Sequence, residues 1–396
     1  MKVLCLIDSL GSGGAQRQLV SLALGLKKRG HEIRFLVYHH EDHFFQFLHS
    51  ADIPCQVIPA CSYVQRILSI RRILRQGWQD VVLAFLEASS LYAELASIPG
   101  REWGLVIGER LADPGMNKGI SHWMRQFHRL ADGIVCNSYT NQLMLGSAFP
   151  FCKRKLFTIY NTVDLKLFKD SSNENKTTDL ERASQFRMII VASYHEKKNM
   201  INVAKALLLL RNMQIRTSIV VDWFGAVQPD SNPFKQVEHF IIEHGLGKSL
   251  LLHQATRNIE KEYPRADAVG LFSFFEGLPN VICEGMACGK PILLSHVCDA
   301  GNLVKDGKNG FLCDPSSPED IALKIQNMVN LSDYKRKQMG NESRRMAEHL
   351  FNEQVVIDSY ERILTRASNH ESFPPDCSWP KDIPESSLST FEKWKK

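Results

Sequence analysis

The sequence predicts an α/β fold made of two successive domains, each built on a doubly wound parallel sheet. Short apolar runs alternate with helical patterns from the start of the chain to about residue 350. A polar stretch, 169–185, interrupts this alternation once near the middle. The 396 residues exceed a typical single domain, and an apolar fraction of 44% can fill two cores.

The first half opens with a strand at 1–8, a loop that contains Gly13, Gly14 and Ala15, and a helix at 16–29. Strand, glycine loop and helix form a common phosphate-binding arrangement, so we expect this loop to contact an anion. The loop reads G-S-G-G-A-Q rather than G-x-G-x-x-G, and no acidic residue ends a second strand at the usual distance, which disfavours a nicotinamide cofactor. The other elements expected in this half are strands 31–38, 56–59, 80–85, 105–107, 133–137 and 155–160, and helices 66–75 and 121–130.

The second half repeats the alternation after the polar stretch. Its expected strands are 188–192, 217–224, 250–253, 268–275, 291–295 and 310–313, and its expected helices are 201–213, 234–244, 318–330, 335–350 and 353–367. From residue 368 onward the chain is polar and rich in proline, and we expect a poorly ordered tail.

The most informative stretch, 274–289, carries two carboxylates, Glu276 and Glu284, on either side of a Gly277-Leu278-Pro279-Asn280 turn. Pro279 and Asn280 suit the first positions of a helix, whose free N–H groups attract an anion. Two acids beside such a site would repel a bare phosphate, so we expect them to bind hydroxyls of a ribose or sugar. The alternative is a surface turn with two solvated acids.

The run E-G-L-P-N-V-I-C-E-G-M-A-C-G-K-P resembles the E-x7-E signature of retaining glycosyltransferases of family 4. The resemblance implies the GT-B fold, in which two Rossmann-like domains face each other across a cleft and a C-terminal helix crosses back onto the first. It implies a nucleoside diphosphate sugar donor, with a UDP-sugar favoured over a GDP-sugar, and no cofactor. Glu276 would then orient sugar hydroxyls, Glu284 would bind the ribose diol, and the backbone of Gly277 to Asn280 would hold phosphate and sugar.

Two further segments carry the resemblance. Gly13, Gly14 and Ala15 match a G-G-A-E loop that contacts the donor diphosphate, with Gln16 where Glu is frequent. The run S-Y-H-E-K-K-N at 193–199 resembles G-R-x4-K-G: Lys198 matches the lysine that grips the diphosphate, while Ser193 replaces the arginine. The residues that could compensate for this lost charge are Arg110, His195 and Lys197.

The resemblance also divides the chain. The predicted parts are an acceptor-side domain at 1–168, a linker at 169–185, a nucleotide-sugar domain at 186–352, a crossover helix at 353–367 and a polar tail at 368–396. The transfer would proceed to a glycan or lipid-linked saccharide at the cytoplasmic face of a membrane.

Many relatives carry a histidine near the sugar in the first domain. The strand ends of this sequence offer Glu87 and Glu109-Arg110 instead. Arg110 is the leading candidate for a catalytic role, and its alternative is a structural salt bridge with Glu109 or Asp113.

We expect His122 and His128 on a surface helix at 121–130. Arg125, His128 and Arg129 would form a basic stripe on that helix. Such a stripe could rest on a membrane, or the helix could simply pack on its own sheet.

Composition limits the remaining possibilities. There is no D-x-D pair and no clustered metal ligands, so we predict activity without a metal. The ten cysteines include no C-x-x-C pair, and no signal peptide or membrane span is evident, so we expect reduced thiols in a cytoplasmic protein.

Residues 1–170 hold 20 basic and 14 acidic residues, against 28 and 29 in the remainder. This basic half suits an anionic membrane surface, a phosphate-bearing acceptor or ordinary solubility, and no nucleic-acid module is present.

Two other function classes fit the same pattern. A nucleotide-sugar 2-epimerase shares the fold and the donor but lacks this E-x7-E arrangement. A non-catalytic nucleotide-sugar binding protein would explain the departures at Ser193 and Gln16.

Overall fold

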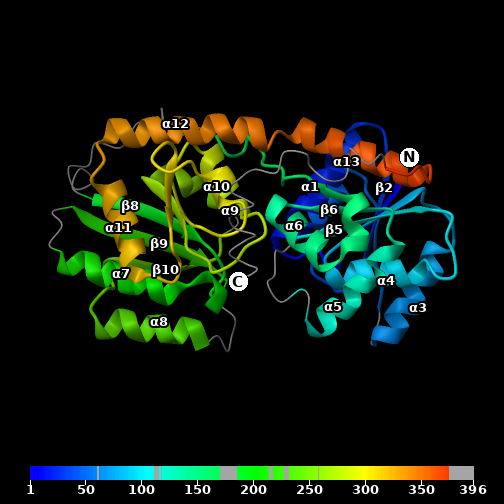
Figure 1. Ribbon diagram of the computed structural model, residues 1–396, viewed down its shortest axis with the longest axis horizontal. Helices are drawn as coiled ribbons and strands as arrows, with labels where there is room; N and C mark the ends of the chain where they lie inside the picture. Colours follow the sequence, from blue (N-terminus) through cyan, green and yellow to red (C-terminus); the bar gives the residue numbers. More distant parts are fainter. Residues whose placement is uncertain are drawn as a thin grey trace. The chain divides into compact units, whose positions relative to one another are not determined.

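The computed structural model describes residues 1–59, 62–110, 116, 118–169, 185–213, 217–226, 232–256 and 258–373. The chain divides into two compact units, one formed by Met1–Thr162 with Glu353–Lys396 and the other by Val163–Asn352. Figure 1 shows that each unit is a sheet flanked by helices. Most of the expected linker and tail lies outside the described residues.

The N-terminal unit holds a seven-stranded parallel sheet in the order β3-β2-β1-β4-β5-β6-β7. Its strands are β1 (Lys2–Leu6), β2 (Glu32–Val37), β3 (Cys55–Val57), β4 (Val81–Phe85), β5 (Gly104–Glu109), β6 (Gly133–Cys136) and β7 (Leu156–Thr158). Its helices are α1 (Gly14–Lys28), α2 (Phe45–Ser50), α3 (Tyr63–Leu74), α4 (Glu87–Ala96), α5 (Gly119–Arg125), α6 (Tyr139–Ala148) and α13 (Glu353–Ser368), with 3₁₀ helices at Gln126–Leu130 and Pro150–Lys155.

The second unit holds a six-stranded parallel sheet in the order β10-β9-β8-β11-β12-β13. Its strands are β8 (Gln185–Val191), β9 (Ser218–Gly225), β10 (Leu250–Gln254), β11 (Ala268–Leu271), β12 (Ile292–Ser295) and β13 (Gly310–Cys313). Its helices are α7 (Met200–Asn212), α8 (Asn232–Glu243), α9 (Asn280–Ala287), α10 (Ala300–Leu303), α11 (Pro318–Val329) and α12 (Asp333–Leu350).

The last helix belongs to the N-terminal unit. Figure 1 shows α13 beside α1, and Ile357, Tyr360 and Leu364 are buried in the core of that unit. A Cβ on Gly25 of α1 would lie 2.1 Å from Ile357 Cδ1, so a larger residue there would require the Ile357 side chain to move. The predicted return of a C-terminal helix to the first domain is thus confirmed, as is the doubly wound parallel fold.

Some elements differ from the prediction, and helices α2, α4, α6 and α10 were not predicted. The strand expected at 268–275 ends at Leu271, because the next residues bond to other loops: Ser295 Oγ donates to the Ser273 carbonyl, and the Phe274 N–H donates to the Lys197 carbonyl. Helices α4 and α6 were missed because most of their residues are buried and show no amphipathic period.

No helix in the described ranges is both long and apolar enough to cross a bilayer. The cysteines within those ranges are mostly buried, and burial raises the pKa of Cys152 to about 12. Cys61 and Cys377 fall outside the described part of the chain.

Candidate active site

In the second unit the loops that carry Lys198 and Glu276 lie where the strand order reverses. β8 lies between β9 and β11, so the connections that follow β8 and β11 run to opposite sides of the sheet. Ligands of open α/β sheets bind at such points, outside the carboxyl ends of the strands. The loops 192–199 and 272–279 both start at this edge.

The loop after β8 is held by buried hydrogen bonds. Asn199 ends it in the left-handed conformation, with φ 63°, and its Nδ2 donates to the carbonyls of Phe272 at 3.0 Å and Pro315 at 2.6 Å. Trp223 Nε1 donates to the Ala192 carbonyl at 2.8 Å. Both ends of the loop are therefore fixed to neighbouring elements, and Lys198 lies one residue before the anchor at Asn199.

Lys198 and Glu276 form an ion pair across these two loops, although 78 positions separate them in the sequence. Both side chains are largely buried, at 16% and 12% exposure. The structure thus brings together the cation expected to bind phosphate and the first carboxylate of the motif. Because the pair is partly shielded from water, its attraction is stronger than that of a surface pair.

The second carboxylate lies one turn inside α9. Pro279 precedes this helix with extended backbone, and Asn280 is its first residue, so the turn at 277–280 sits at the helix start as predicted. Glu284 is 3% exposed, and its Oε2 accepts a hydrogen bond from the hydroxyl of Tyr263 at 3.0 Å. Tyr263 was not predicted, because nothing in the sequence places residue 263 beside α9.

Ser193 is exposed and brings no charge to the position where an arginine was expected. Of the three candidates to compensate, His195 and Lys197 lie on the same loop. The His195 side chain accepts from the Lys197 N–H, and the Lys197 amine lies 5.9 Å from the centre of the Phe275 ring.

The N-terminal unit has its own reversal of strand order, between β1 and β4. The loop with Gly13, Gly14 and Ala15 follows β1, and Gly13 is the extended residue before α1. Gln16 Nε2 donates to Asp8 Oδ1 at 2.8 Å. A glutamate at this position would face Asp8 with a like charge, which accounts for the departure from the family motif in physical terms.

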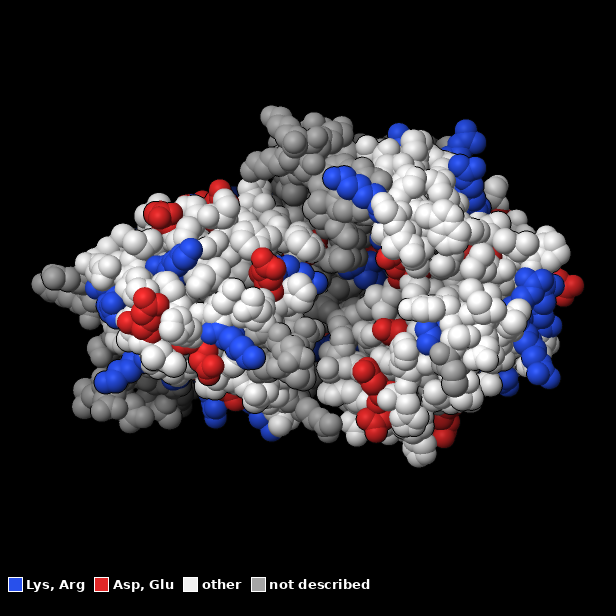
Figure 2. All heavy atoms as spheres, turned by 90° about the horizontal axis from the view of Figure 1, so that it is seen from below, with Lys and Arg blue, Asp and Glu red and all other residues white. Residues whose placement is uncertain are grey.

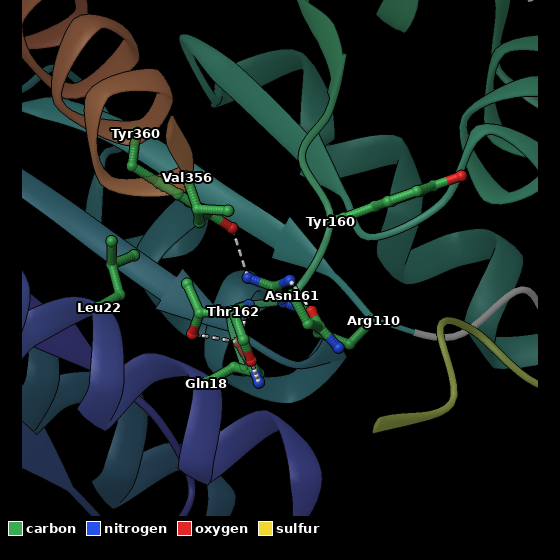
Figure 3. A pocket seen from close by; sticks show the side chains of 8 residues that line it. All are labelled: Gln18, Leu22, Arg110, Tyr160, Asn161, Thr162, Val356 and Tyr360. Atoms are coloured by element: carbon green, nitrogen blue, oxygen red, sulfur yellow. Dashed lines mark hydrogen bonds between the residues drawn. The ribbon is translucent and has the colours of Figure 1, made fainter. Parts of the chain in front are cut away.

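Arg110 lies at the end of β5, and its guanidinium points into the N-terminal unit. Figure 3 shows it between Asn161 and Tyr360: Nη1 donates to Asn161 Oδ1 at 3.3 Å and Nη2 to the Tyr360 hydroxyl at 2.5 Å. The guanidinium carbon lies 3.6 Å from the centre of the Phe85 ring. Neither recorded bond is the expected salt bridge with Glu109, and Asp113 is outside the described residues. An anion that binds the Arg110 guanidinium would have to share it with Asn161 and Tyr360.

Beside Arg110, Gln18 of α1 binds the last residue of the N-terminal segment. Its side chain accepts from the Thr162 N–H at 2.8 Å and donates to the Thr162 carbonyl at 2.9 Å. Arg110, Gln18, Thr162 and Tyr360 line a hollow of about 10 Å³, roughly the space of one water molecule.

The prediction that Arg125, His128 and Arg129 form a basic stripe on a surface helix is wrong. Arg125 and His128 are 3% and 1% exposed and face inward. Arg125 binds both oxygens of Glu109 at 3.1 Å and Glu87 at 2.8 Å, while His128 contacts Glu94 at 2.7 Å and Glu109 at 3.0 Å. We call these five residues the ionic chain. The sequence carried a usable signal, since positions 121, 125 and 128 share one helical face, but it could not identify their buried partners.

The ionic chain changes the pKa values of its members. Burial alone would lower the pKa of His128, but Glu94 and Glu109 outweigh it and raise that pKa to about 9. Burial alone would raise the pKa of Glu109, but Arg125 and His128 lower it to about 2. His128 is therefore protonated at neutral pH and donates to a carboxylate from each ring nitrogen.

Among the described residues, no group of three or more His, Cys, Asp or Glu side chains could hold a metal ion. What the second unit offers is one amine, two carboxylates and a helix start at a single sheet edge. These groups can bind an anion and hydroxyls together.

Comparison with known proteins agrees with this geometry. The model of the family described as glycosyl transferases group 1 matches residues 172–346, and that of glycosyltransferase family 4 matches residues 12–167. A Campylobacter jejuni GalNAc-alpha-(1->4)-GalNAc-alpha-(1->3)-diNAcBac-PP-undecaprenol alpha-1,4-N-acetyl-D-galactosaminyltransferase is 23% identical over 87% of this chain and 93% of its own.

A second Campylobacter jejuni protein, an N-acetylgalactosamine-N,N'-diacetylbacillosaminyl-diphospho-undecaprenol 4-alpha-N-acetylgalactosaminyltransferase, is also 23% identical, over 90% and 98% of the two chains. Among solved structures, Anabaena HepE in complex with UDP aligns with a TM-score of 0.77 at 20% identity, covering 92% of this chain and all of its own. This structural likeness supports the GT-B fold.

We predict that the ionic chain makes stability depend on pH. The folded-state pKa of His128 lies above its ordinary value of 6.5, so the stabilisation is complete below about pH 6.5 and is lost as the pH rises through about 9. It amounts to about 3 kcal/mol at most. His128→Gln should unfold at a lower temperature than the unmodified protein at pH 6.5, and the gap should narrow by pH 9.5. A gap that stays constant across this range would contradict the prediction.

Proposed function

The chain belongs to the group 1 glycosyl transferases, and on that basis we propose that it transfers a sugar from a nucleoside diphosphate sugar to a hydroxyl of a glycan or lipid-linked saccharide. We further propose that the donor is a UDP-sugar, that the anomeric configuration is retained and that no metal ion takes part. The observation that carries the proposal is the Lys198–Glu276 ion pair at the carboxyl edge of the second sheet, close in sequence to the start of α9, the helix that carries Glu284.

The proposed roles follow from charge. Lys198 neutralises the diphosphate as it leaves, and Glu276, released from Lys198, accepts hydrogen bonds from sugar hydroxyls. Glu284 accepts from the ribose diol, with Tyr263 fixing its orientation. Phosphate and sugar are bound by the backbone N–H groups of Gly277, Leu278 and Asn280 at the start of α9. Pro279 lies within this turn and has no N–H group to donate.

The remaining predicted residues take supporting roles in this proposal. Gly13 and Gly14 are exposed and Ala15 is half-buried at the start of α1, a position that suits an approaching phosphate. Ser193 offers a hydroxyl in place of a cation. Arg110 stabilises the negative charge of the leaving group. To do so, its guanidinium must give up its hydrogen bonds to Asn161 and Tyr360.

Two observations support a UDP-sugar and a lipid-linked acceptor. The solved neighbour HepE is described in complex with UDP, and the two Campylobacter relatives are named for undecaprenyl diphosphate-linked substrates. The proposal carries both properties over to this chain.

An acceptor on a lipid also suggests contact with an anionic membrane. On α3, Tyr63, Val64 and Leu68 are 75%, 65% and 58% exposed, and Arg72 follows on the same face. On α5, Ile120 and Trp123 are 76% and 54% exposed. Figure 2 shows Lys and Arg side chains gathered at the right-hand end of the view, on the N-terminal unit. Apolar side chains beside basic ones suit the interface of an anionic bilayer.

The donor proposal predicts that UDP raises the unfolding midpoint in the presence of EDTA, because a ligand that binds only the folded state stabilises it. GDP, ADP and NAD should give smaller shifts. Transfer in EDTA should yield a product whose anomeric proton coupling matches that of the donor. Activity that is lost in EDTA and restored by magnesium would contradict metal independence, and a shift with NAD alone would overturn the proposed function.

Two variants should separate binding from turnover. Glu284→Gln should weaken UDP binding about 10- to 100-fold, the effect of losing one charged hydrogen bond. Lys198→Gln keeps a hydrogen-bonding group next to Glu276 but removes the charge, so kcat should fall about 100-fold or more with a smaller change in UDP binding. Kinetics unchanged in both variants, with unfolding midpoints also unchanged, would refute this assignment.

The membrane contact predicts sedimentation with vesicles that contain anionic phosphatidylglycerol, and less with purely zwitterionic vesicles. Val64→Ser combined with Leu68→Ser should reduce the bound fraction by removing buried apolar area. Lys337 is an exposed residue of α12 in the second unit, so Lys337→Gln serves as the control and should bind vesicles as well as the unmodified protein does. Equal binding by all three proteins would count against α3.

A further inference from the structure

The ionic chain has four buried members and one that reaches solvent. The side chains of Glu94, Glu109, Arg125 and His128 are each less than 8% exposed, whereas that of Glu87 is 35% exposed. Glu87 is thus the member of the ionic chain whose carboxylate can meet a ligand at the surface.

Glu87 sits at the reversal of strand order in the N-terminal sheet. It is the first residue of α4, directly beyond the carboxyl end of β4. Leu6 of β1 lies opposite Ala84 of β4, so Asp8 and Glu87 follow adjacent strand ends. This is the edge at which an open α/β sheet binds its ligand. The predicted donor residues of the second unit do not account for a carboxylate here.

The backbone before Glu87 adopts a conformation that favours glycine. Leu86 has φ 77° and ψ 153°, a conformation that is unfavourable for a residue with a side chain. Conformations of this kind persist where the surrounding structure fixes them, most often at functional sites. At this site the turn leads directly from the strand end into the residue that carries the carboxylate.

The two oxygens of Glu87 differ in their surroundings. Oε1 accepts from Ser121 Oγ at 2.5 Å and from Arg125 Nη1 at 2.8 Å. Arg125 is itself fixed by both oxygens of Glu109. Oε2 has no recorded hydrogen-bond donor within the ranges that the structure describes. The interior thus sets the direction of the carboxylate and leaves one oxygen available to a ligand.

We propose that Glu87 is an acceptor-binding residue whose Oε2 accepts a hydrogen bond from a hydroxyl of the saccharide acceptor. This inference rests on the proposed function. A phosphate would be repelled by this carboxylate, whereas a neutral polyol supplies the donors that a carboxylate lacks. Ser121 and Arg125 are positioning residues, because they act on the acceptor only through Glu87.

Glu87→Gln is a suitable test because the amide oxygen can still accept from Ser121 and Arg125, while an NH₂ group replaces Oε2. We measure transfer from UDP-N-acetylgalactosamine and UDP-glucose to octyl glycosides of N-acetylgalactosamine, galactose and glucose. The variant should lose about 10- to 100-fold in kcat/KM for the acceptor. Its UDP-induced shift in unfolding midpoint and its hydrolysis of the donor by water, without acceptor, should stay unchanged.

Two further variants sharpen the result. Ser121→Ala removes one of the two bonds that orient Glu87, so it should raise the acceptor KM by a smaller factor. Glu32→Gln changes an exposed carboxylate at the amino end of β2, on the opposite edge of the same sheet, and should behave like the unmodified protein.

The outcomes separate this inference from the proposed function. If Glu87→Gln uses the acceptor as well as the unmodified protein does, or if it loses UDP binding together with transfer, the acceptor role of Glu87 is overturned. If the unmodified protein itself shows no UDP shift and no transfer, the proposed function fails instead.

Discussion

The reversal of strand order in each parallel sheet is the constraint on which the other features depend. It sends consecutive connections to opposite faces and leaves an edge where loops from neighbouring strands meet. In the second unit this edge joins Lys198 to Glu276 across 78 positions of sequence. In the N-terminal unit the glycine loop follows β1, and Glu87 follows the neighbouring strand β4. Residues that are far apart in the sequence are therefore brought to one edge of each sheet.

Cations at both edges are already paired with carboxylates. Lys198 is bound by Glu276, and Arg125 by Glu109 and Glu87. A buried cation without a partner would be costly, so this pairing keeps each group charged and oriented before any ligand arrives. In the function proposed above, a diphosphate that reaches Lys198 has to compete with Glu276 for its charge. The displaced Glu276 would then be free to accept hydroxyl groups, which would link recognition of phosphate to recognition of sugar.

Much of the fold was predictable, because parallel strands buried on both faces leave short apolar runs in the sequence. The pairing of Lys198 with Glu276 could be anticipated only through family motifs, since their contact depends on sheet order. The inward direction of Arg125 and His128 was missed because charged residues on a helix usually face water, and the acids that hold them lie on β5 and α4. The partners of Arg110 were equally hidden, because Tyr360 comes from the far end of the chain.

The position of α13 has a consequence for how the protein is made. The N-terminal unit needs Ile357 and Leu364 to complete its core, yet Thr162 and Glu353 are separated by the whole second unit. At about 5–20 residues per second, a ribosome takes roughly 10 to 40 s to synthesise the intervening segment. During that interval the residues of the N-terminal core that pack against Ile357 and Leu364 lack these partners. The N-terminal unit can complete its core only after the last helix has been synthesised.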